Sequence, residues 1–109
     1  MFDLSKPYCF YFNEIAKIPH GSYDEERIAD YIYKFGVDHN LKTIKDTFNN
    51  VIIYKDASVG YKSSAPLLLE AHMDMVCEKN KDSNHDFKKD PLDLYVEDGW
   101  LKARGTTLG

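Results

Sequence analysis

The sequence predicts an α/β fold in which a mixed β-sheet is flanked by two N-terminal helices. Three observations lead to this class. Apolar residues recur at helical spacing before residue 40, short runs rich in β-branched residues follow, and Asn or Gly residues separate those runs. With 109 residues, 43% hydrophobic and 29% charged, the chain has the size and composition of one globular domain at most. The order helix, helix, hairpin, strand, hairpin favours an α/β arrangement.

The first helix is expected to start at Ser5-Lys6-Pro7. Serine is a common N-cap, and proline is tolerated in the first turn because its missing N–H has no intrahelical partner there. The helix should end before Pro19, since the residue before a proline is disfavoured in the α region. One buried stripe is predicted, made of residues at helical spacing: Tyr8, Phe12, Ile15 and Ala16.

The second helix is predicted over residues 23–39. Ser22 and Glu25 form a capping-box pattern, in which the two side chains satisfy free backbone N–H groups at the helix start. Apolar residues then follow at steps of three and four along the helix: Ile28, Tyr31, Ile32 and Phe35.

Two β-hairpins are indicated by their turn residues. Asn49-Asn50 suits a turn that visits positive φ, and Asp98-Gly99 is among the strongest short hairpin patterns. The first hairpin is expected to join 41–46 to 51–55, and the second to join 92–97 to 100–103.

The run Pro66–Ala71 predicts a further strand of a different kind. Its consecutive leucines suggest burial on both faces, hence a central position in the sheet. Polar segments flank it: residues 57–65 are expected to be a mobile connection, and residues 73–90 form a loop long enough to be functional.

Charge and composition exclude several function classes. The net charge of −4 disfavours nucleic-acid binding, which requires a basic surface. No apolar stretch is long enough to span a membrane, and the N-terminus does not resemble a secretory signal. Cys9 and Cys77 do not make a disulfide framework, so we expect reduced thiols and a cytoplasmic location.

The chemistry-bearing motif is His72-Met73-Asp74, which follows the predicted central strand. Open α/β sheets bind ligands at the carboxyl ends of their strands. In an extended backbone, residues two apart point the same way, so the imidazole of His72 and the carboxylate of Asp74 should lie side by side. A metal-ligating histidine typically donates its other ring N–H to a carboxylate. The motif alone is also compatible with a packed histidine, and a catalytic zinc site needs at least three protein ligands.

The longer run Glu70–Asn80 resembles the metal-binding segment of the aminoacyl-histidine dipeptidases. These Xaa-His or β-Ala-His dipeptidases belong to the di-zinc exopeptidase superfamily. Other stretches resemble the family in the same order and spacing: residues 18–22, 49–52, 85–91 and 104–109. The likeness extends over nearly the whole chain from about residue 10.

The resemblance implies that residues 1–109 are an incomplete, N-terminal part of a metallopeptidase catalytic domain. His72 would be a zinc ligand and Asp74 the catalytic-site carboxylate that orients it. In the family, two zinc ions activate a water molecule and a glutamate takes its proton, and the substrates are short dipeptides, particularly those ending in histidine. The aspartate that bridges the ions follows the segment resembling Thr106–Gly109, so this chain supplies only one recognisable ligand. We therefore expect it to be inactive alone.

Several alternatives accompany this reading. His20 could contact substrate, although a solvated turn is the expectation we favour. Cys77 with His85 could form a thiol nucleophile or a separate metal site, but their spacing matches no zinc motif. The chain could also be a non-catalytic, truncated derivative acting as a structural or interaction module. Aromatic residues left exposed would then promote self-association or a homodimer.

Overall fold

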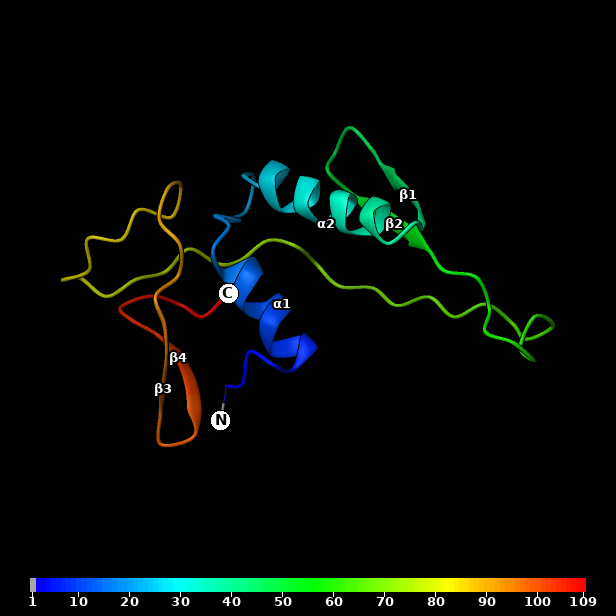
Figure 1. The fold of residues 1–109 in the computed structure, drawn as a ribbon. Coiled ribbons are helices and arrows are strands. Elements are labelled where there is room, and N and C mark those ends of the chain that lie inside the picture. Colours follow the sequence, from blue (N-terminus) through cyan, green and yellow to red (C-terminus); the bar gives the residue numbers. More distant parts are fainter. Residues whose placement is uncertain (1) are drawn as a thin grey trace. The chain divides into compact units, whose positions relative to one another are not determined.

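The computed structural model describes residues 2–109, which divide into two compact units (Figure 1). Unit 1 comprises the chain up to Ile28 together with Asp74–Gly109, and unit 2 is Ala29–Met73. The predicted α/β class and both helices are confirmed. The strands in the described residues form two separate antiparallel pairs rather than one mixed sheet, although one parallel bridge joins Gly21 to Met75.

Helix α1 is Pro7–Ala16, and it starts one residue later than a Ser5 cap requires. The N-cap is Lys6, with no side-chain cap, because a turn closed by the Lys6 N–H on the Asp3 carbonyl (2.9 Å) precedes the helix. The buried residues are Cys9 and Ala16, whereas Tyr8 is 71% exposed. The predicted stripe is therefore wrong at Tyr8 and right at Ala16.

The core of unit 1 gathers around the C-terminal end of α1. Ala16, Met75 and Leu92 are buried together, with Phe87 and Leu94 packed against them. A hydrogen bond from the Leu92 N–H to the Ala16 carbonyl (2.8 Å) ties the helix end to the later segment. Residues far apart in the sequence thus share one small apolar cluster.

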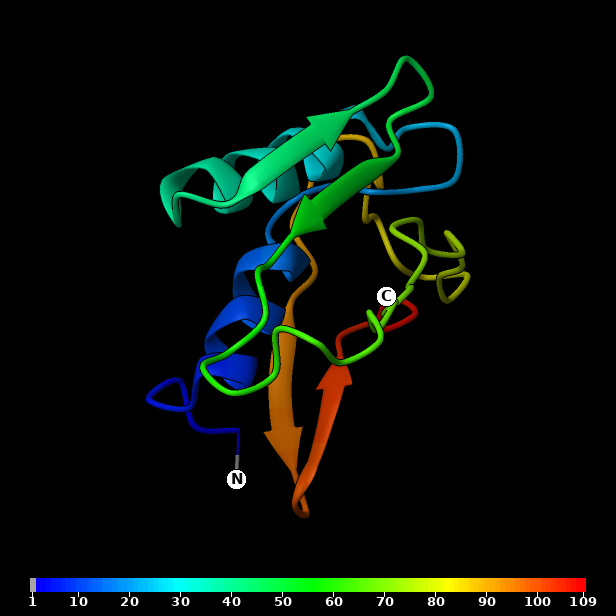
Figure 2. The ribbon, with the colours of Figure 1, turned by 90° about the vertical axis from the view of Figure 1, so that its right-hand side faces the viewer.

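The second predicted hairpin is confirmed in unit 1. Strands β3 (Leu94–Glu97) and β4 (Trp100–Ala103) pair in antiparallel register, with Glu97 opposite Trp100 (Figure 2). Asp98 (φ 51°) and Gly99 (φ 79°) both have positive φ, as a two-residue turn of the type I′ class requires.

Helix α2 is Glu26–Asp38, shorter than predicted at its N-terminal end. The predicted apolar stripe is confirmed at its start, where Ile28 is 1% exposed. The capping box is wrong: Glu25 Oε1 accepts a hydrogen bond from the Tyr23 N–H (2.7 Å), while the Ser22 hydroxyl bonds to a residue far along the chain. The Ser22 side chain therefore makes a tertiary contact, and α2 begins only at Glu26.

Unit 2 contains the first hairpin, also as predicted. Strands β1 (Lys42–Lys45) and β2 (Val51–Tyr54) are antiparallel, and Asn49 has φ 67° in the connecting turn. Gly36 of α2 lies so close to β1 that a Cβ there would stand 2.1 Å from the Thr43 hydroxyl oxygen. The absence of a side chain at Gly36 thus permits the close approach of helix and hairpin.

The predicted central strand Pro66–Ala71 is wrong for this chain. Figure 1 shows the segment between β2 and Met73 as an irregular trace, and Leu67, Leu68 and Leu69 are each 84% exposed. A strand buried on both faces requires strands on either side of it, and none of the described strands pairs with this run. Among residues 2–109, moreover, no helix is both long and apolar enough to cross a bilayer.

Candidate functional site

The predicted site residues lie at the junction of the two units along the chain. His72 is exposed and belongs to unit 2, whereas Asp74 is half-buried and belongs to unit 1. The segment that carries them is irregular rather than the end of a strand. What the structure describes in detail is the surroundings of Asp74 within unit 1.

A short segment, His20-Gly21-Ser22, holds the chain at Asp74-Met75. The Met75 N–H donates to the His20 carbonyl (2.9 Å), which forms the parallel bridge between Gly21 and Met75. The Ser22 hydroxyl donates to Asp74 Oδ2 (2.6 Å), across 52 positions of sequence. A hydroxyl donating to an ionised carboxylate is one of the stronger hydrogen bonds in proteins. Two hydrogen bonds therefore fix this position: one to the Asp74 carboxylate and one from the N–H of the next residue, Met75.

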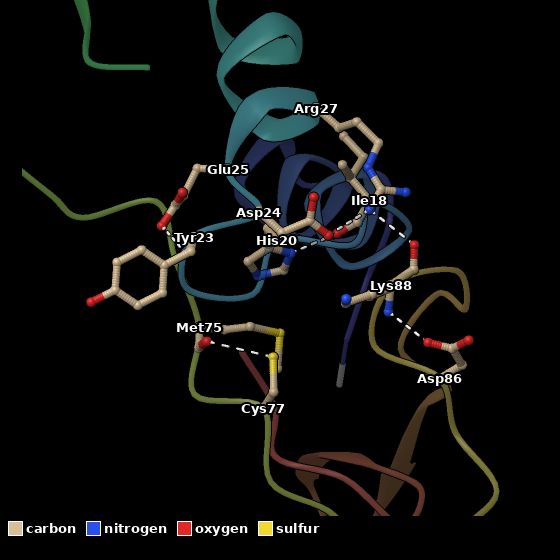
Figure 3. A network of polar contacts seen from close by, with 10 residues as sticks. All are labelled: Ile18, His20, Tyr23, Asp24, Glu25, Arg27, Met75, Cys77, Asp86 and Lys88. Carbon is tan, nitrogen blue, oxygen red and sulfur yellow. Dashed lines mark hydrogen bonds and ion pairs between the residues drawn. The ribbon is translucent and has the colours of Figure 1, made fainter. Parts of the chain in front are cut away.

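His20 is buried, contrary to the solvated turn that the sequence favoured. It is 5% exposed, and its Nδ1 lies 2.6 Å from the Ile18 carbonyl. Figure 3 marks this contact with a dashed line. A carbonyl can only accept, so Nδ1 carries the proton. The other ring nitrogen lies 3.5 Å from the point where a Cβ on Gly109 would stand. The segments that approach His20, Met75 at its carbonyl and Gly109 near its ring, lie far along the chain, so a local turn pattern does not reveal the burial.

The turn after His20 is fixed at several points. The Asp24 N–H donates to the Gly21 carbonyl (2.9 Å), and Tyr23 adopts φ 67° within this turn. Arg27 donates to both Asp24 Oδ2 (2.8 Å) and the Lys88 carbonyl (2.9 Å), which joins the turn to the later loop (Figure 3). Ser22 is therefore presented to Asp74 from an anchored turn.

The side chain of Cys77 packs against the backbone of Gly21. A Cβ built on Gly21 would stand only 2.5 Å from the Cys77 sulfur. The same sulfur lies 3.8 Å from the Met75 carbonyl oxygen, and Figure 3 marks this contact. Burial of the sulfur, and then the carboxylates of Asp24, Asp74 and Glu78, raise the pKa of the Cys77 thiol above its usual value. Cys77 is consequently protonated at neutral pH, which argues against a thiolate nucleophile.

We predict slow alkylation of Cys77 at neutral pH. Since only the thiolate reacts, the raised pKa lowers the reactive fraction below that of an unperturbed cysteine and moves the rise in rate to higher pH. Iodoacetamide labelling across a pH series, read at the Cys77 peptide by mass spectrometry with glutathione as reference, measures this. A pH midpoint at or below that of glutathione would contradict it.

The chain after Cys77 is bound to the C-terminal segment of unit 1. Lys79 and Thr106 form an antiparallel bridge, and the Thr107 hydroxyl donates to the Val76 carbonyl (2.7 Å). His85 lies edge-on to Phe87 at a ring separation of 4.6 Å, and its Nε2 is buried without a hydrogen-bond partner. The segment from Asp74 onward therefore runs between two others, at Gly21 and at Thr106.

The described residues do not by themselves fit a catalytic zinc ion. No group of three His, Cys, Asp or Glu side chains within residues 2–109 is arranged to hold a metal. A catalytic zinc needs three protein ligands and an open position. Neither the pair His72 and Asp74 nor the pair Cys77 and His85 belongs to such a group among residues 2–109.

The sequence predicts different surroundings for His20 and Ser22. It favours a solvated turn for His20, which is buried, and a helix cap for Ser22, which instead contacts Asp74. No local pattern marks the Ser22 contact, because its partner lies 52 positions away in the sequence.

Comparisons with known proteins agree with the fold and the motifs. No family model matches the chain. It is 45% identical over 98 residues to the cytosol non-specific dipeptidase of Escherichia coli (strain K12). The aligned region covers 90% of this chain and 20% of that protein. The crystal structure of aminoacylhistidine dipeptidase from Vibrio alginolyticus matches with a TM-score of 0.90 and 40% identity, over 94% of this chain and 21% of that one. The chain spans about a fifth of each relative and is homologous to that part of these two dipeptidases.

Proposed function

We propose that this chain is the N-terminal part of the catalytic domain of a zinc-dependent dipeptidase acting on short dipeptides, including those ending in histidine. The observation that carries the proposal is the likeness to two dipeptidases over at least 90% of the chain, in sequence and in fold. The name of the Escherichia coli relative supports a cytoplasmic location.

Within this proposal, His72 is one zinc ligand and Asp74 the carboxylate that orients its ring. The exposure of His72 leaves its ring accessible to further ligands, and the bond from Ser22 fixes the Asp74 carboxylate. The remaining ligands would come from polypeptide other than residues 2–109. Zinc, when bound, lowers the pKa of water and polarises a carbonyl.

The alternative is a non-catalytic module. Two observations would suit it: the described residues contain no three-ligand cluster, and the leucine run is exposed. Hydrolysis of alanyl-histidine, assayed with added zinc, separates the two. We expect turnover by the complete translated polypeptide that contains residues 1–109, and none by the 109-residue chain. Turnover by neither would favour the module, and turnover by the short chain would contradict our account of the ligands.

A further inference from the structure

We propose that unit 1 carries a binding site for a small zwitterion of the α-amino acid class, beside the turn that leads into α2. The site is a cavity of about 400 Å³ lined by Tyr23, Asp24, Glu26, Arg27 and Lys88. All five residues belong to unit 1, and neither His72 nor Asp74 is among them. The inference is therefore independent of the proposed function.

The cavity is lined by two carboxylates and two cations, and only one of each is paired within the protein. Arg27 Nη2 lies 2.8 Å from Asp24 Oδ2, so these two side chains neutralise each other. The Glu26 carboxylate and the Lys88 ammonium form no ion pair, either with each other or with another residue in the described part of the chain. One carboxylate and one ammonium group therefore remain for a ligand.

Hydrogen bonds fix the walls of the cavity in the ligand-free protein. Arg27 donates to the Lys88 carbonyl (2.9 Å), and the Lys88 N–H donates to Asp86 Oδ1 (2.9 Å), as the dashed lines in Figure 3 mark. Tyr23 has φ 67°, an unfavourable conformation for a bulky residue, and Glu25 Oε1 holds its N–H (2.7 Å). Backbone conformations of this kind, maintained by the surrounding contacts, cluster at ligand-binding sites.

The unpaired charges of the cavity define the chemistry of the ligand. An α-amino acid carries one ammonium and one carboxylate at neutral pH, which complement Glu26 and Lys88 respectively. Arg27 uses only Nη2 in its two contacts, so the N–H groups on Nε and Nη1 remain for the same ligand carboxylate. A ligand with a single charge would leave one of the two protein charges unpaired, and it should bind more weakly.

The experiment measures alanine binding to the metal-free complete polypeptide by saturation-transfer NMR. We expect a dissociation constant of about 1–10 mM, because a small ligand at an exposed site gains little free energy. Glu26→Gln and Lys88→Gln should each weaken binding by about 3–5-fold, the usual size of an exposed charge contact. Matched controls outside the cavity are Glu78→Gln and Lys89→Gln, since both side chains are exposed and Lys89 pairs with Asp86 at 3.6 Å.

Single-charge probes test the zwitterion directly. Propionate and ethylamine, which each lack one charge of alanine, should bind about 3–5-fold more weakly than alanine. Because Glu26 and Lys88 are exposed, neither substitution should lower the thermal midpoint, so a loss of binding reports on the site. Equal alanine binding by the parent and both cavity variants, or propionate binding as tight as that of alanine, would overturn the inference.

A third variant separates this cavity from the predicted metal site. His72 does not line the cavity, so His72→Ala should bind alanine as the parent does. Loss of alanine binding in His72→Ala would place the ligand elsewhere and would also overturn the inference. Failure of the complete polypeptide to hydrolyse alanyl-histidine would contradict only the proposed function.

Discussion

Substituting His72 by alanine in the complete polypeptide should remove bound zinc and dipeptidase activity together. The reason is that a metal ligand is lost outright, whereas Asp74→Ala removes only the group that orients it. The Asp74 substitution should therefore weaken zinc binding by about 10–100-fold, and the His72 substitution by more. Zinc content by atomic absorption and kcat/KM on alanyl-histidine measure both.

Because His72 is exposed, its substitution should affect zinc binding without affecting folding. Because its side chain is not in the cluster around Ala16 and Met75, His72→Ala should leave the thermal midpoint of the metal-free protein unchanged. His39→Ala is a suitable control, since His39 is also exposed and in unit 2, with its ring bonded to the Phe35 carbonyl (2.7 Å). Full zinc content in His72→Ala would contradict the assignment.

The second large effect concerns the leucine run of unit 2. Three consecutive leucines have side chains that are each 84% exposed, and their backbone pairs with none of the described strands. Exposed apolar side chains on an unpaired extended segment promote association between protein molecules. We expect the 109-residue chain to self-associate in solution, and Leu67→Lys with Leu69→Lys to weaken association by at least about 100-fold, since each buried leucine contributes about 1.5–3 kcal/mol.

Sedimentation equilibrium measures this association, and the structure offers a matched control. Val59 and Tyr61, 97% and 65% exposed, lie in the polar segment of the same unit, and replacing both by lysine adds the same charge. That control should associate like the parent chain. A monomeric parent chain, or equal weakening by both double variants, would show that the leucines do not drive association.

Features set by neighbouring residues were predictable from the sequence. Asn49 and the pair Asp98-Gly99 mark their hairpins correctly, because positive φ at a turn depends on the residues in the turn itself. The apolar periodicity of α2 likewise predicts Ile28 at the buried face.

Features that depend on residues far apart in the sequence were not predictable from local patterns. The consecutive leucines predict a central strand over Pro66–Ala71, but such a strand needs neighbours that no described strand supplies. Ser22 fits a helix cap by local pattern, yet its hydroxyl donates to Asp74, 52 positions along the chain. His20 is buried, and the segments that approach it, at Met75 and Gly109, lie far along the chain, so no local pattern predicts its burial. Only the family resemblance pointed to these stretches.

The most direct test of the account is a crystal structure of the zinc-loaded complete polypeptide, with the metal located by anomalous scattering at the zinc edge. We predict one ring nitrogen of His72 at about 2.0–2.1 Å from zinc, with its other nitrogen donating to Asp74 and Ser22 still bonded to that carboxylate. Zinc bound without His72, or Asp74 turned away from the ring, would contradict it.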